Sequence, residues 1–184
     1  VCKNSFPSQP KRFWNDKKNQ KYKKAYFNKF KNIWHHGDYA EKKKTGGYII
    51  YGRSDATLNP GGVRLGTAEI YSVVEGFEQI KESICVGQSW KNDVRIILFV
   101  VLKKNHQLSS NLIKSIKVAI RKDASPRHVP AKIIQVKDIP RTKNGKIVEL
   151  AVKNIIEGIS IKNKQALANP EALNLFRRLD ELTY

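Results

Sequence analysis

The chain has 184 residues, of which 40% are hydrophobic, so it is long enough for one ordinary domain and an additional segment. No apolar run approaches the roughly 20 residues that a membrane-spanning helix needs. The first residues also lack the charged-then-apolar pattern of a secretion signal. We therefore expect a cytoplasmic protein with no membrane partner. Because the chain contains no methionine, we also expect it to be a piece of a longer product.

The formal net charge of +19 is concentrated near the N-terminus. Residues 1–44 hold thirteen Lys and Arg residues against three acidic ones, a net charge of +10. Such an excess suits proteins that bind nucleic acid, acidic membranes or polyphosphates. The lysines occur in polar stretches without a recognisable recognition helix, so solubility explains them at least as well. We expect no nucleic-acid partner, and a basic nucleic-acid-binding module stays the alternative from a different class of function.

The cysteines and histidines show no spacing typical of metal ligands. Cys85 lies in an apolar run, which is typical of a buried small hydrophobic residue. His35 and His36 stand side by side without further ligands at a useful spacing. The sequence therefore predicts no protein-bound metal.

The first half of the chain predicts a helix and two hairpins. Aromatic residues at three- and four-residue intervals predict a short amphipathic helix over residues 19–31. Residues 32–51 read as a hairpin that ends in the apolar strand YIIY. Residues 52–69, GRSDATLNPGGVRLGTAE, place turn residues between two apolar runs, which predicts a second hairpin and then a helix.

Beyond residue 66 the hydrophobic pattern alternates between helices and strands. The expected elements are a helix over 67–80, strands over 82–90 and 94–102, a helix over 110–122, a strand over 132–136, and helices over 148–158 and 171–182. We therefore expect an α+β fold with a sheet of about three strands, two helices on one side of it and an added β-hairpin.

Three motifs resemble those of the adenylate-forming acyl-CoA synthetases, in the same order. They are WHHGD at residues 34–38, GRSDATLNPGGVRLGTAEIY at 52–71 and IPRTKNGKIVELAVK at 139–153. The resemblance is close over residues 32–184 and loose over residues 1–31. It implies that residues 1–52 form the C-terminal end of a large nucleotide-binding domain and that residues 53–184 form a mobile C-terminal domain.

The resemblance also implies an ATP-dependent acid–thiol ligase that works in two half-reactions. The acid reacts with ATP, as its Mg²⁺ complex, to give an acyl-adenylate, and CoA then takes the acyl group and releases AMP. The tail NKQALANPEAL at residues 163–173 resembles the acetoacetate-activating branch of the family. The expected substrates are therefore acetoacetate, ATP and CoA, with an acetyl- or propionyl-CoA-forming enzyme as the alternative. The phosphate-binding loop and the acyl pocket are expected on an N-terminal domain outside this chain, so the fragment alone is expected to be inactive.

By the same resemblance, Lys146 is the catalytic lysine. Its loop contains an Asn-Gly pair, which favours a tight turn with positive φ. The ammonium group would bridge the substrate carboxylate and the α-phosphate during adenylation only. By composition alone, Lys146 would be read as an ordinary surface lysine.

Two residues are expected at the nucleotide and one at the hinge. Asp38 would accept hydrogen bonds from the ribose hydroxyls, because a carboxylate offers two acceptor oxygens. From the residues alone, a turn aspartate is the commoner reading. Arg53 would contact the ribose or a phosphate, and Asp55 would be the hinge about which the small domain rotates.

Three further residues are expected to bind CoA. Gly62 and Arg64 would approach the pantetheine arm, where a side chain in place of the glycine would obstruct the thiol. Arg121 would pair with the 3′-phosphate of CoA. Arg127 and His128 would add positive charge nearby, although basic residues also suit the C-terminus of a helix for structural reasons alone.

Overall fold

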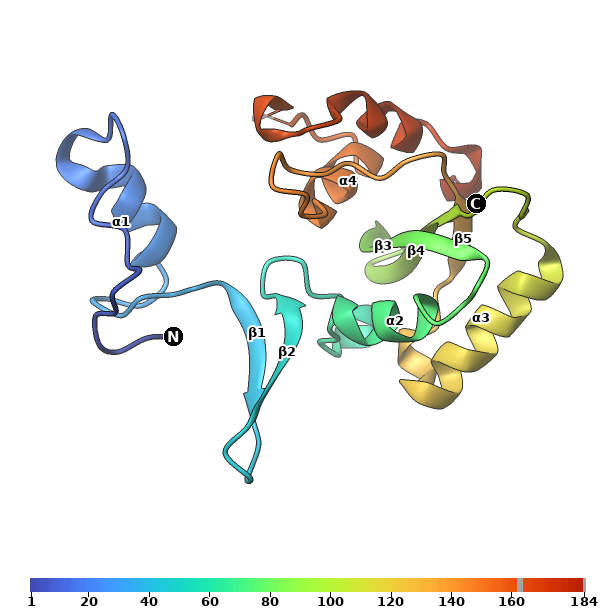
Figure 1. The fold of residues 1–184 in the computed structure, drawn as a ribbon, viewed down its shortest axis with the longest axis horizontal. Coiled ribbons are helices and arrows are strands. Elements are labelled where there is room, and N and C mark those ends of the chain that lie inside the picture. The colour runs from blue at the N-terminus through green and yellow to red at the C-terminus, as the bar shows by residue number, and fades with distance from the viewer. Residues whose placement is uncertain (162–163, 184) are drawn as a thin grey trace. The chain divides into compact units, whose positions relative to one another are not determined.

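The computed structural model describes residues 1–161 and 164–183. Its internal contacts divide the chain into two compact units, Val1–Asp38 and Tyr39–Tyr184 (Figure 1). The expected domain boundary after residue 52 stays a prediction. Within the described ranges, no helix combines the length and the apolar character needed to cross a bilayer.

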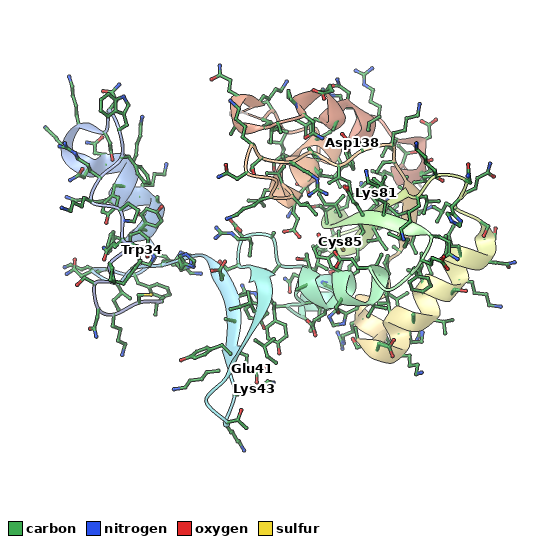
Figure 2. The ribbon with its side chains drawn as sticks, viewed as in Figure 1. Trp34, Glu41, Lys43, Lys81, Cys85 and Asp138 are labelled. Carbon is green, nitrogen blue, oxygen red and sulfur yellow. The ribbon has the colours of Figure 1, made fainter. Side chains whose placement is uncertain are left out.

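The N-terminal unit is built around Trp34 (Figure 2), which is 4% exposed. The Trp34 ring stacks on Tyr26, with ring centroids 3.7 Å apart, and Phe27 meets it edge-on. Tyr26 is the last residue of helix α1 (Gln20–Tyr26). This helix is shorter than the predicted 19–31, because Phe27 leaves helical geometry and packs on the tryptophan instead.

Strands β1 (Asp38–Lys42) and β2 (Tyr48–Arg53) form the predicted first hairpin. Across the pair, the Tyr51 hydroxyl donates a hydrogen bond to Glu41 Oε2 over 2.6 Å. This bond to the carboxylate raises the pKa of Tyr51 to about 12. Glu41 and the nearby Lys43 lie along this hairpin in Figure 2.

The second unit contains a three-stranded sheet with the order β3–β4–β5. Strands β3 (Ile80–Trp90) and β4 (Asp93–Leu102) are antiparallel and joined by a two-residue turn. Both turn residues, Lys91 and Asn92, have positive φ, which suits the twist of a tight hairpin. Strand β5 (Lys132–Gln135) pairs with β4 in parallel.

Both faces of this sheet are covered (Figure 1). Helices α2 (Thr67–Val74) and α3 (Ser110–Asp123) pack on one face, as predicted. Helix α4 (Glu149–Ile156) and the C-terminal tail, residues 164–183, pack on the other. The side chains of β4 alternate between them, with Ile96, Leu98 and Val100 on the α2 side and Ile97, Phe99 and Val101 on the α4 side. The fold is therefore the expected α+β domain with a second covering layer that the pattern did not predict.

Two predicted elements are shorter in the structure. The second hairpin is reduced to one bridge between Leu58 and Leu65, around a 3₁₀ turn at Pro60–Gly62. The helix predicted over 67–80 ends at Val74, because the next residues form turns that lead directly into β3.

The helix predicted over 171–182 is interrupted in the structure. The tail instead contains two 3₁₀ segments, Pro170–Phe176 and Asp180–Leu182. Phe176 is fully buried and meets Phe99 edge-on, with ring centroids 4.8 Å apart. The residue after Phe176, Arg177, has an extended backbone, so the first 3₁₀ segment ends there.

Candidate functional site

The predicted catalytic residue Lys146 is exposed on a tight turn, the lysine loop, residues 140–147. Gly145 has a φ of +77°, as the Asn-Gly pair predicts, and its amide donates to Thr142 O over 2.8 Å. Two further bonds tie Thr142 to Lys146. The Thr142 amide donates to Lys146 O over 2.8 Å, and the Lys146 amide donates to Thr142 Oγ1 over 3.1 Å. The loop therefore fixes the backbone of Lys146 while the side chain extends into solvent.

Arg141 braces this loop against the sheet. Its Nη2 donates to Glu82 Oε2 on β3, and its Nη1 donates to Gly145 O over 3.1 Å. Both the guanidinium and the carboxylate are largely covered. The positive charge that the loop presents to solvent is therefore carried by Lys143 and Lys146, whereas Arg141 is paired. The sequence pattern gave no sign of the pairing between Arg141 and Glu82.

The C-terminal tail runs beside the lysine loop as a short antiparallel partner. The Lys143 amide donates to Ala166 O over 3.1 Å, and the Ala168 amide donates to Arg141 O over 2.8 Å. The Asn169 side chain also accepts a hydrogen bond from the Arg141 amide over 2.8 Å. Sequence reasoning read the Asn-Pro pair only as a helix start and missed this role.

The predicted ribose ligand Asp38 opens β1 and is exposed. Its Oδ2 lies 2.5 Å from Nδ1 of His36, a residue to which the sequence assigned no role. Asp38 belongs to the N-terminal unit, whereas the other predicted site residues belong to the second unit. Each unit thus carries its own share of the predicted site.

The predicted hinge residue Asp55 is exposed in a turn that the Ala56 amide closes onto Arg53 O over 3.2 Å. Arg53 Nε lies 3.3 Å from Asp55 Oδ1, and Arg53 Nη2 donates to Asp55 Oδ2 over 3.4 Å. Both side chains are about half exposed. Exposed pairs of this kind contribute at most about 1 kcal/mol to stability.

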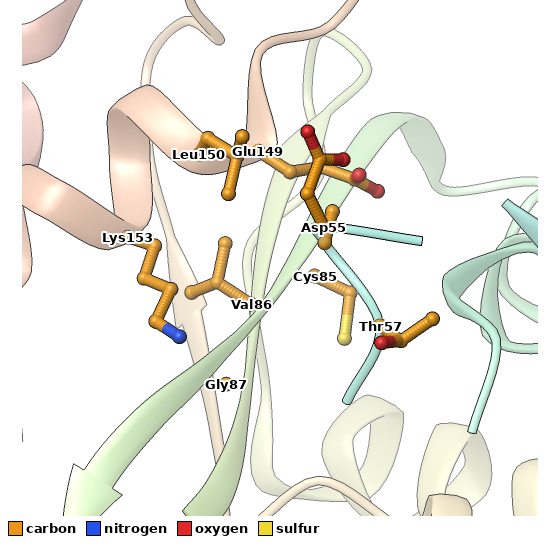
Figure 3. Close-up of a pocket in the computed structure, with 9 residues that line it drawn as sticks. Asp55, Thr57, Cys85, Val86, Gly87, Glu149, Leu150 and Lys153 are labelled. Carbon is orange, nitrogen blue, oxygen red and sulfur yellow. The ribbon is translucent and has the colours of Figure 1, made fainter. Parts of the chain in front are cut away.

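A small pocket lies beside the hinge residue (Figure 3). Asp55 and Thr57 line it together with Cys85 of β3 and Glu149 and Lys153 of α4. Its volume of about 10 Å³ is roughly that of one water molecule, so it is far too small for a nucleotide.

The groups next to this pocket form a buried hydrogen-bond chain. The Tyr71 hydroxyl donates to Glu149 Oε1 over 2.6 Å and accepts from the Cys85 amide over 2.9 Å. Burial raises the pKa of Glu149, although hydrogen bonds from Tyr71 and Thr67 favour its charged form. Burial also raises the pKa of the Cys85 thiol. Cys85 is therefore the buried, unreactive residue that its sequence context predicted.

Gly62 ends the exposed 3₁₀ turn Pro60–Gly62 and has a φ of +75°. A Cβ atom at this position would meet no atom of the described residues within 4 Å, so within this chain the backbone angle is what requires glycine. The turn is held by Asp93, whose Oδ1 and Oδ2 accept from the Gly61 amide over 2.9 and 3.1 Å. Amide hydrogen bonds from Val94 and Gly61 lower the pKa of Asp93.

Arg64 borders an open recess of about 370 Å³. Its guanidinium carbon lies 5.9 Å from the centroid of the Tyr39 ring. The other walls of the recess include Tyr51, Glu69 and His128. The recess therefore combines one exposed cation with aromatic and polar groups.

The basic residues predicted around the CoA phosphate divide into two groups. Arg121, in the last turn of α3, and Arg127 are exposed. Arg127 Nη1 would lie 3.7 Å from a Cβ atom at Gly61, so this arginine lies near the glycine turn. His128, in contrast, is 4% exposed and its Nδ1 lies 2.8 Å from Ser125 Oγ. His128 is thus buried, and its Nε2 lies 3.2 Å from Glu69 Oε2, so it does not add the expected exposed charge.

Among the described residues, no cluster of His, Cys, Asp and Glu has the arrangement of a metal site.

Comparisons with known proteins give a consistent result. Residues 69–146 match the family described as AMP-binding enzyme C-terminal domain. The chain is 59% identical over 182 residues to an acetoacetyl-coenzyme A synthetase of Rhizobium meliloti (strain 1021), and 50% identical over 184 residues to an acetoacetyl-CoA synthetase of Gallus gallus. Each alignment covers 99% of this chain and 28% of the relative. The chain thus spans little more than a quarter of the length of these curated relatives.

Solved structures show the same likeness. An acetoacetyl-CoA synthetase from Streptomyces lividans superposes with a TM-score of 0.89 at 36% identity, covering 99% of this chain and 28% of that one. A benzoate CoA ligase from Burkholderia xenovorans LB400 gives a TM-score of 0.66 at 27% identity, covering 80% of this chain and 28% of that one.

Proposed function

We propose that this chain, which contains the C-terminal domain of an AMP-binding enzyme, is the C-terminal part of a ligase that joins acetoacetate to CoA. In the first half-reaction, acetoacetate and ATP give acetoacetyl-adenylate and pyrophosphate. In the second, the CoA thiol takes the acetoacetyl group and AMP leaves. The observation that carries the proposal is the exposed Lys146 on a loop whose backbone is fixed by hydrogen bonds.

Lys146 acts in the first half-reaction. A carboxylate oxygen of acetoacetate attacks the α-phosphorus of ATP as the bond to pyrophosphate breaks, and negative charge gathers between the two reactants. An ammonium group aimed at this position stabilises the charge as it develops. Lysine suits the task because it is a compact point charge on a flexible stem. The rigid loop beneath it keeps that stem pointed away from the domain's own core.

The nucleotide contacts come from Asp38 and Arg53. Asp38 accepts hydrogen bonds from the ribose, oriented by its contact with His36. Arg53 leaves its weak pair with Asp55 to meet the nucleotide. ATP enters as its Mg²⁺ complex, and we assign no metal ligand to this chain.

The second half-reaction uses a different face of the same domain. Rotation about Asp55, in its exposed turn, brings Gly62 and Arg64 to the pantetheine arm and Arg121 to the 3′-phosphate of CoA. Positive charge from Arg127 beside the glycine turn supports this surface.

The partner of this chain is an N-terminal domain that supplies the phosphate-binding loop and the acyl pocket. We place the boundary of the mobile domain between residues 52 and 53, just before the hinge turn, and the enzyme in the cytoplasm.

The test is Lys146→Ala in the enzyme that contains this chain, with Lys143→Ala as the matched control on the same loop. We expect Lys146→Ala to slow adenylation about 10²- to 10³-fold, since one well-placed charge of this kind is lost. Thioester formation from supplied acetoacetyl-adenylate should be unaffected, and the control should resemble the parent in both steps. Pyrophosphate exchange and single-turnover thioester assays measure the two steps.

An equal loss in both half-reactions would contradict the role of Lys146. Parallel assays with acetate and propionate test the acyl preference separately, and a preference for either acid over acetoacetate would assign the enzyme to another branch.

A further inference from the structure

We infer that Asn169 of the C-terminal tail is a positioning residue that sets the lysine loop for the adenylation step. This inference rests on the proposed function and extends it to a residue far from the lysine in sequence. Asn169 acts through the backbone that carries Lys146 and touches no substrate.

The amide of Asn169 uses both of its ends. Its Oδ1 accepts from the Arg141 amide over 2.8 Å, and its Nδ2 donates to Asp138 Oδ2 over 2.7 Å and to Ile139 O over 2.9 Å. Asp138 in turn accepts from the Ile139 amide through Oδ1, over 2.9 Å. If the amide were rotated by 180°, its NH₂ group would face the Arg141 amide and its oxygen would face Asp138 and Ile139 O. These contacts therefore fix the orientation of the Asn169 amide. Neither a carboxylate nor an apolar side chain would satisfy all three partners.

The surroundings make these bonds hard to replace with water. Ile139 is fully buried, Leu167 is 7% exposed, and the amide itself is partly buried. A buried polar group that loses its partner keeps its desolvation cost, so the loop is held more firmly than by exposed bonds of equal length. The adjacent backbone bonds of Lys143 and Ala168 align the tail with the loop.

The effect reaches Lys146 through the two ends of the loop. Asn169 fixes the Arg141 amide, and Arg141 Nη1 holds Gly145 O over 3.1 Å. Arg141 also forms an antiparallel bridge with Ile147, the residue after the lysine. Loss of the amide therefore loosens the point from which the Lys146 stem departs. Small displacements of a catalytic group from its productive position cost up to about 10²-fold in rate.

The experiment compares Asn169→Ala with Asn174→Ala in the enzyme that contains this chain. Asn174 is an exposed asparagine of the same tail and serves as the matched control. We expect Asn169→Ala to lower the rate constant of adenylation about 10- to 10²-fold. Thioester formation from supplied acetoacetyl-adenylate and the KM for ATP should stay at the parent values.

A second pair of variants separates positioning from simple stability. Asn169→Asp places two carboxylates within hydrogen-bond distance, so adenylation should be slower still and should partly recover at lower pH, where the pair shares a proton. The double variant Asp138→Asn with Asn169→Asp exchanges the two groups. The amide at position 138 then donates to the carboxylate at position 169, and its oxygen still accepts from the Ile139 amide. Because the carboxylate at position 169 cannot donate to Ile139 O, we expect this variant to recover only part of the rate lost in Asn169→Asp, but to be faster than that single variant at neutral pH.

Provided that Lys146→Ala impairs adenylation selectively, three results would overturn the inference. These are parental adenylation in Asn169→Ala, equal loss in both half-reactions, and no recovery in the exchanged double variant. Should Lys146→Ala itself fail to impair adenylation, the proposed function falls first and the inference falls with it, so the two failures are distinguishable.

Discussion

Glu149 carries a carboxyl group whose environment opposes its ionisation. It opens helix α4, three residues after Lys146, and its side chain lies beside that of Asp55 (Figure 3). Burial raises its pKa, and the charge of Asp55 adds to this effect, while hydrogen bonds from Tyr71 and Thr67 act in the opposite direction. The folded protein therefore holds a proton on Glu149 more readily than the unfolded chain does.

Replacement of Glu149 by glutamine should remove a pH dependence of stability. A raised folded-state pKa means that the contribution of Glu149 is fully present below the unfolded value and is lost as the pH rises through the folded value. Glutamine keeps an acceptor for the Tyr71 hydroxyl but has no charge to bury. We expect Glu149→Gln to gain stability relative to the parent as the pH rises above about 4.3, the ordinary value for glutamate. Urea unfolding of both proteins at several pH values measures this, and a pH-independent difference would contradict the assignment.

For single residues, the sequence indicated which residue types form a motif, but it did not indicate which distant residues they contact. Arg141 and Asn169 are 28 residues apart, and Arg141 and Glu82 are 59 apart. Local pattern carries no information about such pairs, because they exist only once the tail and β3 lie against the loop. His128 shows the same limit, since it is buried with its Nε2 3.2 Å from Oε2 of Glu69, a residue on the distant helix α2.

Among the secondary-structure elements, the strands were the best predicted because their apolar runs are long. Strand β4 is buried on both faces from Ile96 onward, whereas the sequence analysis expected helices on one face only, because an apolar run does not say what covers each face. The tail was predicted as one continuous helix, although its apolar residues suit more than one period. Leu173 and Phe176 are three residues apart, which a 3₁₀ segment places on one side, and both are buried in the cluster on the α4 side of the sheet.

The tail should therefore be an integral part of the domain core. Phe176 is fully buried against Phe99, so Phe176→Ala leaves a cavity that the sheet cannot close. We expect a loss of about 3 to 5 kcal/mol in the free energy of unfolding. Val118→Ala, at a position 57% exposed on α3, is the control and should change stability by no more than about 0.5 kcal/mol. Urea denaturation of the chain measures both, and similar small losses would show that the tail is only loosely attached.

For the whole molecule, the organisation into two compact units matters more than any single contact. The residues proposed for the nucleotide, Asp38 and Arg53, stand on either side of the division at residue 38, and the CoA-binding residues all belong to the second unit. Under the proposed function, rotation about Asp55 would let one small domain serve two half-reactions.

The position of the hinge gives the last prediction. Asp55 lies third in the turn that joins Arg53 O to the Ala56 amide, and proline there fixes φ near −65° and also restricts the residue before it. We expect Asp55→Pro to slow thioester formation from supplied acetoacetyl-adenylate while adenylation is largely kept. Asp55→Ala removes the ion pair with Arg53 but leaves the backbone free, so it should retain both half-reactions.

The two variants together separate the backbone from the side chain. If Asp55→Ala impaired thioester formation as strongly as Asp55→Pro, the carboxylate and its pair with Arg53 would be responsible, and rotation about residue 55 would be unnecessary. If Asp55→Pro formed thioester at the parental rate, the rotation would have to occur at another residue, because a proline cannot pass through the range of φ that a large swing of the domain requires.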